Sequence, residues 1–212
     1  MSTLMRRLGW ALCLAALCRT DSQARARICL DVNLRFNEQA PPAALVESMQ
    51  QEAAAIWKTY GIDLRWEDSS SPPPGGAMLF DVLLDQSHHS ELRAVLGDAR
   101  LPAQPSRYVP IRLDRQAIED VLRMVTFEQL SHLTRHANIR EEDVGRALGR
   151  VLALELGHAL LATGEHRAIG LMRPAFSGEE LLAGRRDLYD LSAADVARLA
   201  SIRRGQLEPA SR

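Results

Sequence analysis

The chain has 212 residues, of which 26 are basic and 27 are acidic, so its formal net charge is -1. Hydrophobic residues make up 46% of the sequence and charged residues 25%, which is the balance of a soluble globular protein. This length is sufficient for one domain with a sizeable core. A charge balance this even offers no strongly basic surface for nucleic acid or for an anionic membrane, so we expect neither partner.

The N-terminus has the pattern of a secretory signal peptide. Arg6 and Arg7 precede an uncharged run over residues 8–18, and an Ala-x-Ala sequence ends at Ala26. An apolar run of about eleven residues reaches only about half-way across a bilayer, which disfavours a transmembrane anchor. We predict that residues 1–26 are removed and that the protein is exported, to the periplasm or out of the cell, with no stable membrane span afterwards.

The remaining domain, residues 27–212, contains one cysteine, Cys29, because Cys13 and Cys18 lie in the predicted signal peptide. One thiol cannot form an internal disulfide, so the fold has to depend on its hydrophobic core. Cys29 falls within an apolar strand pattern, which predicts a small buried side chain rather than a nucleophile.

The first part of this domain predicts a strand, a helix and a second strand. β-Type residues alternate over residues 27–36, apolar residues recur at helical spacing over 43–60, and a short β-type run covers 62–66. Gly61 marks the end of the helix. This order favours a parallel crossover at the start of a mixed sheet.

Two further strands are predicted before the chain becomes helical. They cover residues 78–84 and 108–113, and Pro110 within the second favours an edge position because proline cannot donate a ladder hydrogen bond. Residues 86–104 between them are poorly patterned. The expected sheet therefore has about four strands.

The second part of the domain is predicted to be helical. Helices are expected over residues 115–124 and 127–136, then a long helix capped by Asn138 and ended by Gly164, and a last helix over 193–203. The long helix is apolar around most of its circumference, which predicts burial on several sides. The predicted fold class is α+β, with a mixed sheet, a buried central helix and a helical C-terminal part.

The central helix carries the residues that suggest a functional site. Glu155 and His158 lie one turn apart within an apolar run, and His166 and Met172 follow after the helix has ended. Residues four apart on a helix point to the same side, so Leu154 and His158 share a face. Burying an acid and an imidazole is costly unless they have partners, and this cost is the physical reason to suspect a site.

This helix resembles the active-site helix of zincin metallopeptidases, whose pattern is His-Glu-x-x-His. The Gly-Leu-Met-Arg-Pro sequence around Met172 is similar to the methionine turn of metzincin-like peptidases. The resemblance implies that His158 and His166 bind Zn²⁺ and that Met172 forms the floor of the site. It also implies that Glu155 is the general base for a metal-activated water that hydrolyses a peptide bond, with a peptide or protein as substrate.

One ligand of that pattern is missing, because Leu154 stands where the first His would be. His166 also comes two residues later than the usual metzincin spacing. Catalytic zinc takes three protein ligands, and structural zinc binding is worth about 10–16 kcal/mol over four, so losing one removes several kcal/mol. Glu155 could become a third ligand together with His158, as Glu-x-x-His pairs do in helical bundles, but it would then no longer serve as the base.

Several functions are compatible with these residues. The protein is a zinc metallopeptidase with a substitute third ligand, a non-catalytic descendant whose site binds a peptide or protein, or a metal-binding or structural protein that uses Glu155, His158 and His166. We favour a catalytically impaired peptidase, since a leucine offers no lone pair to the metal. Glu155 and His158 could also be a buried, hydrogen-bonded pair with no function. The other histidines are predicted to lie on the surface: His88, His89, His132 and His136.

Overall fold

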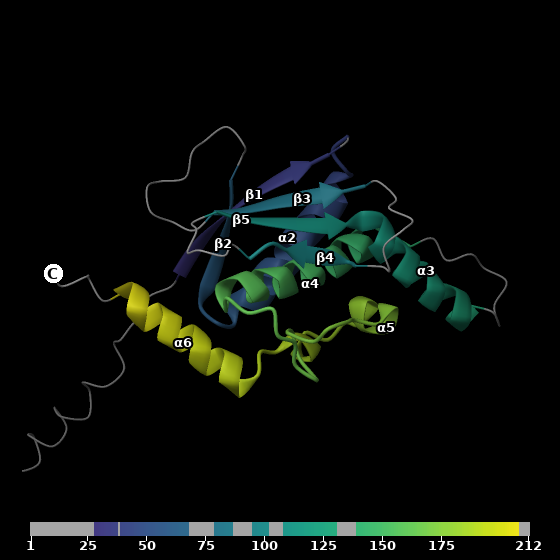
Figure 1. Cartoon of the computed structure of the whole chain (residues 1–212). Coiled ribbons are helices and arrows are strands. Elements are labelled where there is room, and N and C mark those ends of the chain that lie inside the picture. The colour runs from purple at the N-terminus through teal and green to yellow at the C-terminus, as the bar shows by residue number, and fades with distance from the viewer. Residues whose placement is uncertain are drawn as a thin grey trace, which may run out of the picture.

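The computed structural model of the chain describes residues 28–37, 39–67, 79–86, 95–101, 108–130 and 139–207 (Figure 1). The strands are β1 (Ile28–Phe36), β2 (Ile62–Glu67), β3 (Leu79–Asp85), β4 (Gly97–Ala99) and β5 (Tyr108–Asp114). The helices are α2 (Ala43–Lys58), α3 (Arg115–Leu130), α4 (Glu141–Leu160), α5 (Gly178–Leu182) and α6 (Ala193–Leu207), with a 3₁₀ turn at Asp187–Tyr189. The predictions that lie outside the described residues are the signal peptide and the four surface histidines. The predicted cap at Asn138 is wrong, because α4 begins at Glu141 and its N-cap residue is Arg140, which makes no side-chain cap hydrogen bond.

The strands form one mixed sheet in the order β2-β1-β3-β5-β4. Strands β2, β1, β3 and β5 are parallel to one another, and β4 pairs with β5 in the antiparallel direction. The α+β fold class and four of these strands are as the sequence predicts. The prediction of about four strands missed β4, because its three residues have no alternating pattern and owe their conformation to pairing with β5.

The edge position predicted for Pro110 is wrong, because β5 lies between β3 and β4. The carbonyl oxygen of Pro110 accepts a hydrogen bond from Arg100 N on the β4 side. In an antiparallel pair the N–H and C=O of one residue point to the same side, so the nitrogen of Pro110 also faces that side. There β4 has already ended at Ala99, and a missing N–H costs the sheet little.

Helices α2 and α4 lie on one face of the sheet and pack closely against each other (Figure 1). A stripe of small residues, Gly145, Gly149, Ala153 and Gly157, runs along α4 at four-residue intervals, which is one face of a helix. A Cβ added at Gly149 would lie only 2.6 Å from the carbonyl oxygen of Met49 on α2. The two backbones therefore approach as closely as they do because these positions carry almost no side chain.

The sheet has one apolar and one charged face, as strand alternation requires. The apolar face packs on the helices and buries Val32, Phe80 and Ile111, among others. On the opposite face Asp31 and Asp81 are also buried and pair with arginines: Arg65 with Asp31 at 2.6 Å and Arg35 with Asp81. The charged face is therefore held by ion pairs between neighbouring strands.

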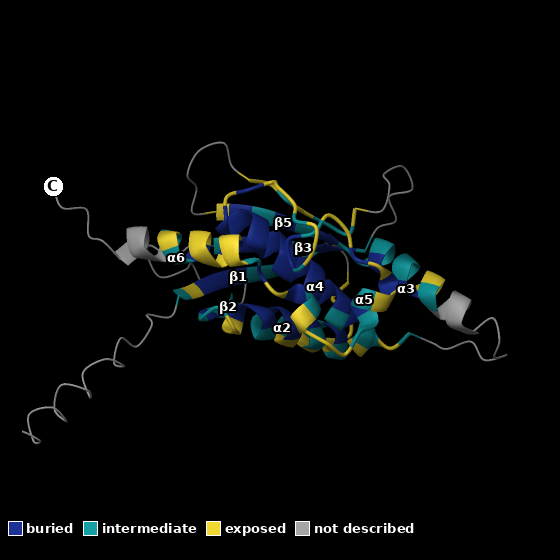
Figure 2. Cartoon of the chain, turned by 90° about the horizontal axis from the view of Figure 1, so that it is seen from below, coloured by how far each residue is buried: buried dark blue, intermediate teal, exposed yellow. Residues whose placement is uncertain are grey.

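Helix α4 crosses the middle of the molecule and is buried along nearly its whole length (Figure 2). It ends in a Schellman turn, in which Thr163 N donates to the carbonyl of His158 and Ala162 has a φ of 44°. The prediction that Gly164 would be the left-handed cap is wrong, since Ala162 takes that conformation. Residues 115–130, predicted as two helices with a break, form the single helix α3.

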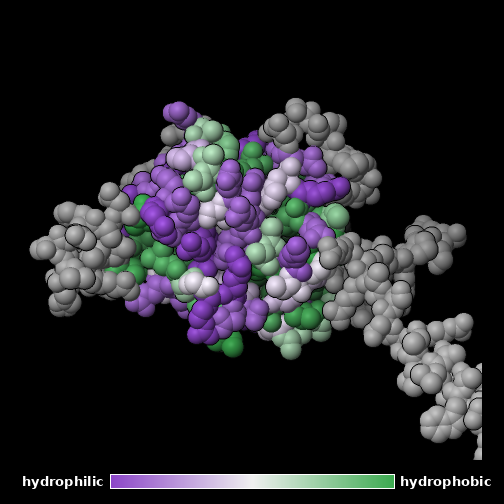
Figure 3. Space-filling view, turned by 180° about the vertical axis from the view of Figure 1, so that it is seen from behind, coloured by the Kyte–Doolittle hydropathy of each residue, from purple (hydrophilic) through white to green (hydrophobic). Residues whose placement is uncertain are grey.

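The remaining surface is mixed in character. Figure 3 shows a hydrophilic band across the rear face, with smaller hydrophobic areas beside it. Cys29 is exposed, so its predicted burial is wrong: it lies on the side of β1 that faces away from the helices. None of the helices in the described ranges has the length and apolar character that a membrane crossing needs.

Candidate functional site

The last two turns of α4 and the loop that follows bring two imidazoles together. The ring centroids of His158 and His166 are 4.9 Å apart, and the rings meet edge to face at 85°. His158 is buried, whereas His166 is exposed. Two histidines eight residues apart in sequence therefore share one place, as the resemblance implies they would.

The Schellman turn at the end of α4 orients the His158 ring. It brings Thr163 back against the helix, and the carbonyl oxygen of Thr163 lies 2.7 Å from His158 Nδ1. Because a carbonyl only accepts, Nδ1 carries the proton and Nε2 keeps its lone pair. Histidines that bind metals usually donate their other ring N–H to such an oxygen, so His158 has the tautomer of a ligand.

The electrostatics of this end of α4 favour a neutral imidazole. Burial lowers the pKa of His158, and the neighbouring His166 lowers it further, although the hydrogen bond to Thr163 acts in the opposite direction. A neutral ring has a free lone pair for a metal or a proton.

Glu155 faces β4, the strand that the sequence did not predict. A Cβ added at Gly97 would lie 3.1 Å from Glu155 Oε1, so the absence of a side chain there lets β4 lie against the carboxyl group. Burial raises the pKa of Glu155 to about 7, and the charge of Asp98 adds to the rise. The backbone N–H of Ala99 opposes it by hydrogen bonding to the carboxylate. Glu155 thus titrates close to neutral pH.

Met172 packs against the last turns of α4, next to Gly157. A Cβ added at Gly157 would meet Met172 Sδ at 2.6 Å, so the thioether fills the space that a side chain would otherwise take. Met172 is only 1% exposed. Met172 therefore lies next to Gly157, the residue that precedes His158, and its role as a floor of the site stays a prediction.

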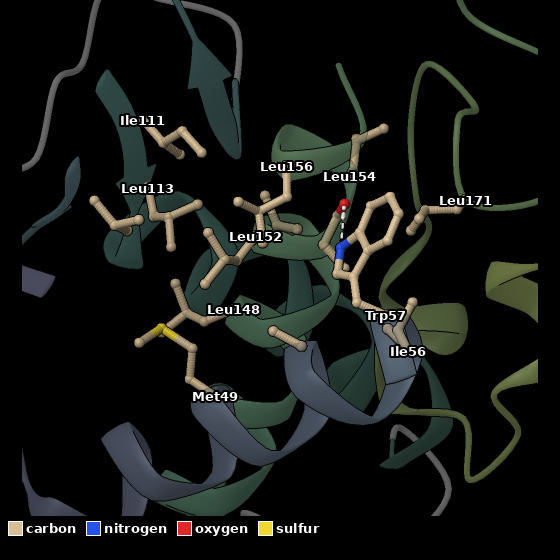
Figure 4. Close-up of a cluster of buried hydrophobic side chains, with 14 of the residues drawn as sticks. Met49, Ile56, Trp57, Ile111, Leu113, Leu148, Leu152, Leu154, Leu156 and Leu171 are labelled. Carbon is tan, nitrogen blue, oxygen red and sulfur yellow. Dashed lines mark hydrogen bonds between the residues drawn. The ribbon is translucent and has the colours of Figure 1, made fainter. Parts of the chain in front are cut away.

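Leu154 occupies the place that the pattern reserves for a ligand. It is buried, and Figure 4 shows it near the indole of Trp57, whose Nε1 donates to the carbonyl of Ala153 over 3.2 Å. Leu171 lies near the same indole (Figure 4). The leucine is therefore part of an apolar cluster that replaces a polar ligand position.

The residues of this site do not fit a catalytic zinc ion, which needs three protein ligands. His158 and His166 supply two donors, and Leu154 supplies none. Across the part of the chain that the structure describes, no three His, Cys, Asp or Glu side chains are gathered in a way that could hold a metal ion. The metal-binding alternative requires Glu155 to join the two histidines in one cluster, and it does not.

No protein-family model matches the chain, and a search of curated proteins gives no match either. The interpretation of the site therefore rests on its own residues.

Sequence reasoning missed the residues that support the site. Gly97 and Asp98 lie in the poorly patterned region, and Thr163 contacts His158 through its backbone carbonyl. Backbone groups leave no trace in residue type, so no signal could have found Thr163. A glycine and an acid next to each other give only a weak turn signal, which does not indicate contact with α4.

Proposed function

We propose that this protein is an exported, metzincin-like relative of the zinc metallopeptidases whose hydrolytic site is impaired. The observation that carries the proposal is the combination of a retained imidazole pair with a lost ligand. His158 and His166 lie with their rings 4.9 Å apart, while the position one turn before His158 is filled by the buried Leu154. Random placement of two histidines would not be expected to reproduce this geometry beside a buried carboxyl group and a methionine floor.

The second part of the proposal is that the site binds a peptide or protein segment without cleaving it. Strand β4 is the edge of the sheet, and the backbone groups of Gly97 and Ala99 alternate with those that bond to β5. Of these groups, the N–H of Ala99 is already bonded to Glu155. Edge strands present unpaired backbone groups that an extended peptide can pair with. Because β4 lies against Glu155, a peptide there would run past the impaired site.

Peptide cleavage by the full chain and by Leu154→His tests the first part. The purified proteins are loaded with zinc and incubated with a mixed peptide library, and products are read by mass spectrometry. We expect no cleavage by the unmodified chain and chelator-sensitive cleavage by Leu154→His. Leu160→His is the matched control, because it places the same new imidazole on the same helix away from the pair.

Cleavage by the unmodified chain that a chelator abolishes would contradict impairment. It would favour the alternative of an active peptidase with a substitute ligand. A second change, Glu155→Gln in the Leu154→His background, should remove the gained cleavage if Glu155 is the base that the resemblance implies. Peptides retained by the unmodified chain but not cut would support the binding role.

A further inference from the structure

The His166 ring has no hydrogen bond of its own to any residue in the described ranges, and it is exposed. An exposed loop side chain without partners ordinarily samples several rotamers and several backbone positions. Its place 4.9 Å from His158 must therefore come from the backbone that carries it.

That backbone is fixed on both sides of His166. On one side Glu165 N donates to Thr163 Oγ1 over 3.1 Å, and Thr163 in turn holds His158. On the other side Arg167 N donates to the carbonyl of Met172 over 2.7 Å. The loop is thus tied to the His158 turn and to the methionine floor at once.

The side chain of Arg167 extends this tie to α6. Its Nε lies 3.3 Å and its Nη2 3.0 Å from the two carboxylate oxygens of Asp195, a two-point contact that fixes direction as well as distance. Asp195 is only 1% exposed and is itself held by Ser192 Oγ at 2.6 Å. A buried, fully engaged carboxylate is a rigid anchor for an arginine that is about one-third exposed.

A second contact from the same helix closes the loop at its start. Arg198 Nη2 donates to the carbonyl of Ala162 over 3.2 Å, at the residue with the left-handed backbone. The first turns of α6 therefore hold the segment between α4 and the methionine floor at two separate points.

We propose that Arg167 and Asp195 are positioning residues that hold His166 against His158 in the absence of any metal. Glu165 also lies beside Arg167, at 3.5 Å, but it is exposed and adds only a weak contact. The imidazole pair is preorganised by an ion pair outside the site rather than gathered by an ion within it.

The first test is made without metal, in the full chain that keeps Leu154. Nuclear Overhauser contacts between the His158 and His166 ring protons are measured in the parent and in Arg167→Gln. We expect the contacts to be lost in Arg167→Gln and partly restored in Arg167→Lys, which keeps the charge but not the two-point geometry. Arg185→Gln is the matched control, because it breaks an exposed arginine–aspartate pair elsewhere in the C-terminal part.

The second test rests on the proposed function, since it uses zinc in the Leu154→His background. There Arg167→Gln should weaken zinc binding by about 10–100-fold, as loss of groups that orient ligands generally does. Arg185→Gln should leave it within twofold. If Leu154→His alone binds no zinc, the proposed function fails, and the ring contacts still decide the positioning role.

Unchanged ring contacts in a folded Arg167→Gln protein would overturn the proposal. Should Arg167→Gln not fold, Asp195→Asn breaks the same ion pair by removing the negative partner, and it keeps a side chain that can bond to Ser192. Loss of the ring contacts in Arg185→Gln as well would also overturn it, because the effect would then be a general loosening of the C-terminal part.

Discussion

Two halves of α4 bury charged groups in different ways. In the first half Arg150, 1% exposed, donates to Glu52 Oε1 at 2.9 Å and to backbone carbonyls that include Ala183 at 2.7 Å. In the second half Glu155 is also buried, but it faces Asp98 and has its pKa raised to about 7. The same helix therefore carries one buried charge that is paired with an opposite charge, and one buried carboxyl group that accepts a backbone hydrogen bond but faces a like charge.

This difference separates structure from site. Arg150 ties the C-terminal segment to the helix core, since its other carbonyl partners, Glu180 and Leu181, belong to α5. A satisfied buried arginine gains nothing from a ligand. A buried carboxyl group whose pKa is raised by burial and by a neighbouring like charge is a candidate for a functional role, because it costs stability without improving packing.

The largest effect that the comparison predicts is on Arg150. Arg150→Met should lower the free energy of unfolding by about 3–5 kcal/mol, because it removes the buried ion-pair partner of Glu52, which keeps the exposed Arg186, and the donor to three backbone carbonyls. Urea unfolding of the full chain measures the loss. Arg146→Met, one turn earlier, removes a partly exposed pair with Asp143 and should cost no more than about 1 kcal/mol. Equal losses in the two variants would mean that the buried ion pair of Arg150 contributes no more to the free energy of unfolding than a partly exposed pair does.

The next effect is the pH dependence that Glu155 imposes. Its pKa rises from 4.5 when unfolded to about 7 when folded, so the folded state binds more protons between these values. The contribution of Glu155 to stability should therefore fall as pH rises from 4.5 to 7, by about 3 kcal/mol in all. Glu155→Gln should flatten this part of the curve and be the more stable protein at pH 8, as measured by urea unfolding across pH.

Glu179→Gln is the control for that experiment, since it changes the same residue type at an exposed position on α5. Its curve should follow that of the parent. If the Glu155→Gln curve ran parallel to that of the parent between pH 4.5 and 7, the pKa of Glu155 would not be raised by folding, and the contrast with Arg150 would disappear.

A smaller effect sharpens the structural side of the comparison. Gly149→Ala should lower the free energy of unfolding by about 1–3 kcal/mol, because the new Cβ would meet the α2 backbone at 2.6 Å. Gly164→Ala is the matched control, with no atom within 4 Å of the added Cβ. Thermal unfolding compares the two variants. If Gly149→Ala were as stable as the parent, helices α2 and α4 would not approach each other closely at this position.

The sequence was sufficient where a pattern repeats. Alternation predicted β1, β2, β3 and β5, and helical spacing predicted α2 and the buried helix α4. Contacts that depend on tertiary structure could not be predicted. Strand β4 owes its existence to β5, and the partners of Arg150 lie 98 residues earlier, at Glu52, and about 30 residues later in the chain.

The site shows the same division. Spacing along one helix predicted that Leu154, Glu155 and His158 would lie near each other. The resemblance, rather than spacing, predicted that His166 would join His158 after the helix turns. The left-handed residue was predicted to be Gly164, whereas the hydrogen bonds of the Schellman turn place that conformation at Ala162. The link from Arg167 to Asp195 joins two segments with no shared pattern, so only the folded chain reveals it.

Zinc affinity measured by competition with a chromophoric chelator tests the central claim most directly, in the unmodified chain and in Leu154→His. A missing ligand worth several kcal/mol corresponds to a difference on the order of a thousandfold, at about 1.4 kcal/mol for each tenfold. We therefore expect weak binding in the unmodified chain and stoichiometric binding in Leu154→His. Stoichiometric zinc in the unmodified chain, with an affinity within tenfold of the variant, would contradict the claim that Leu154 has impaired the site.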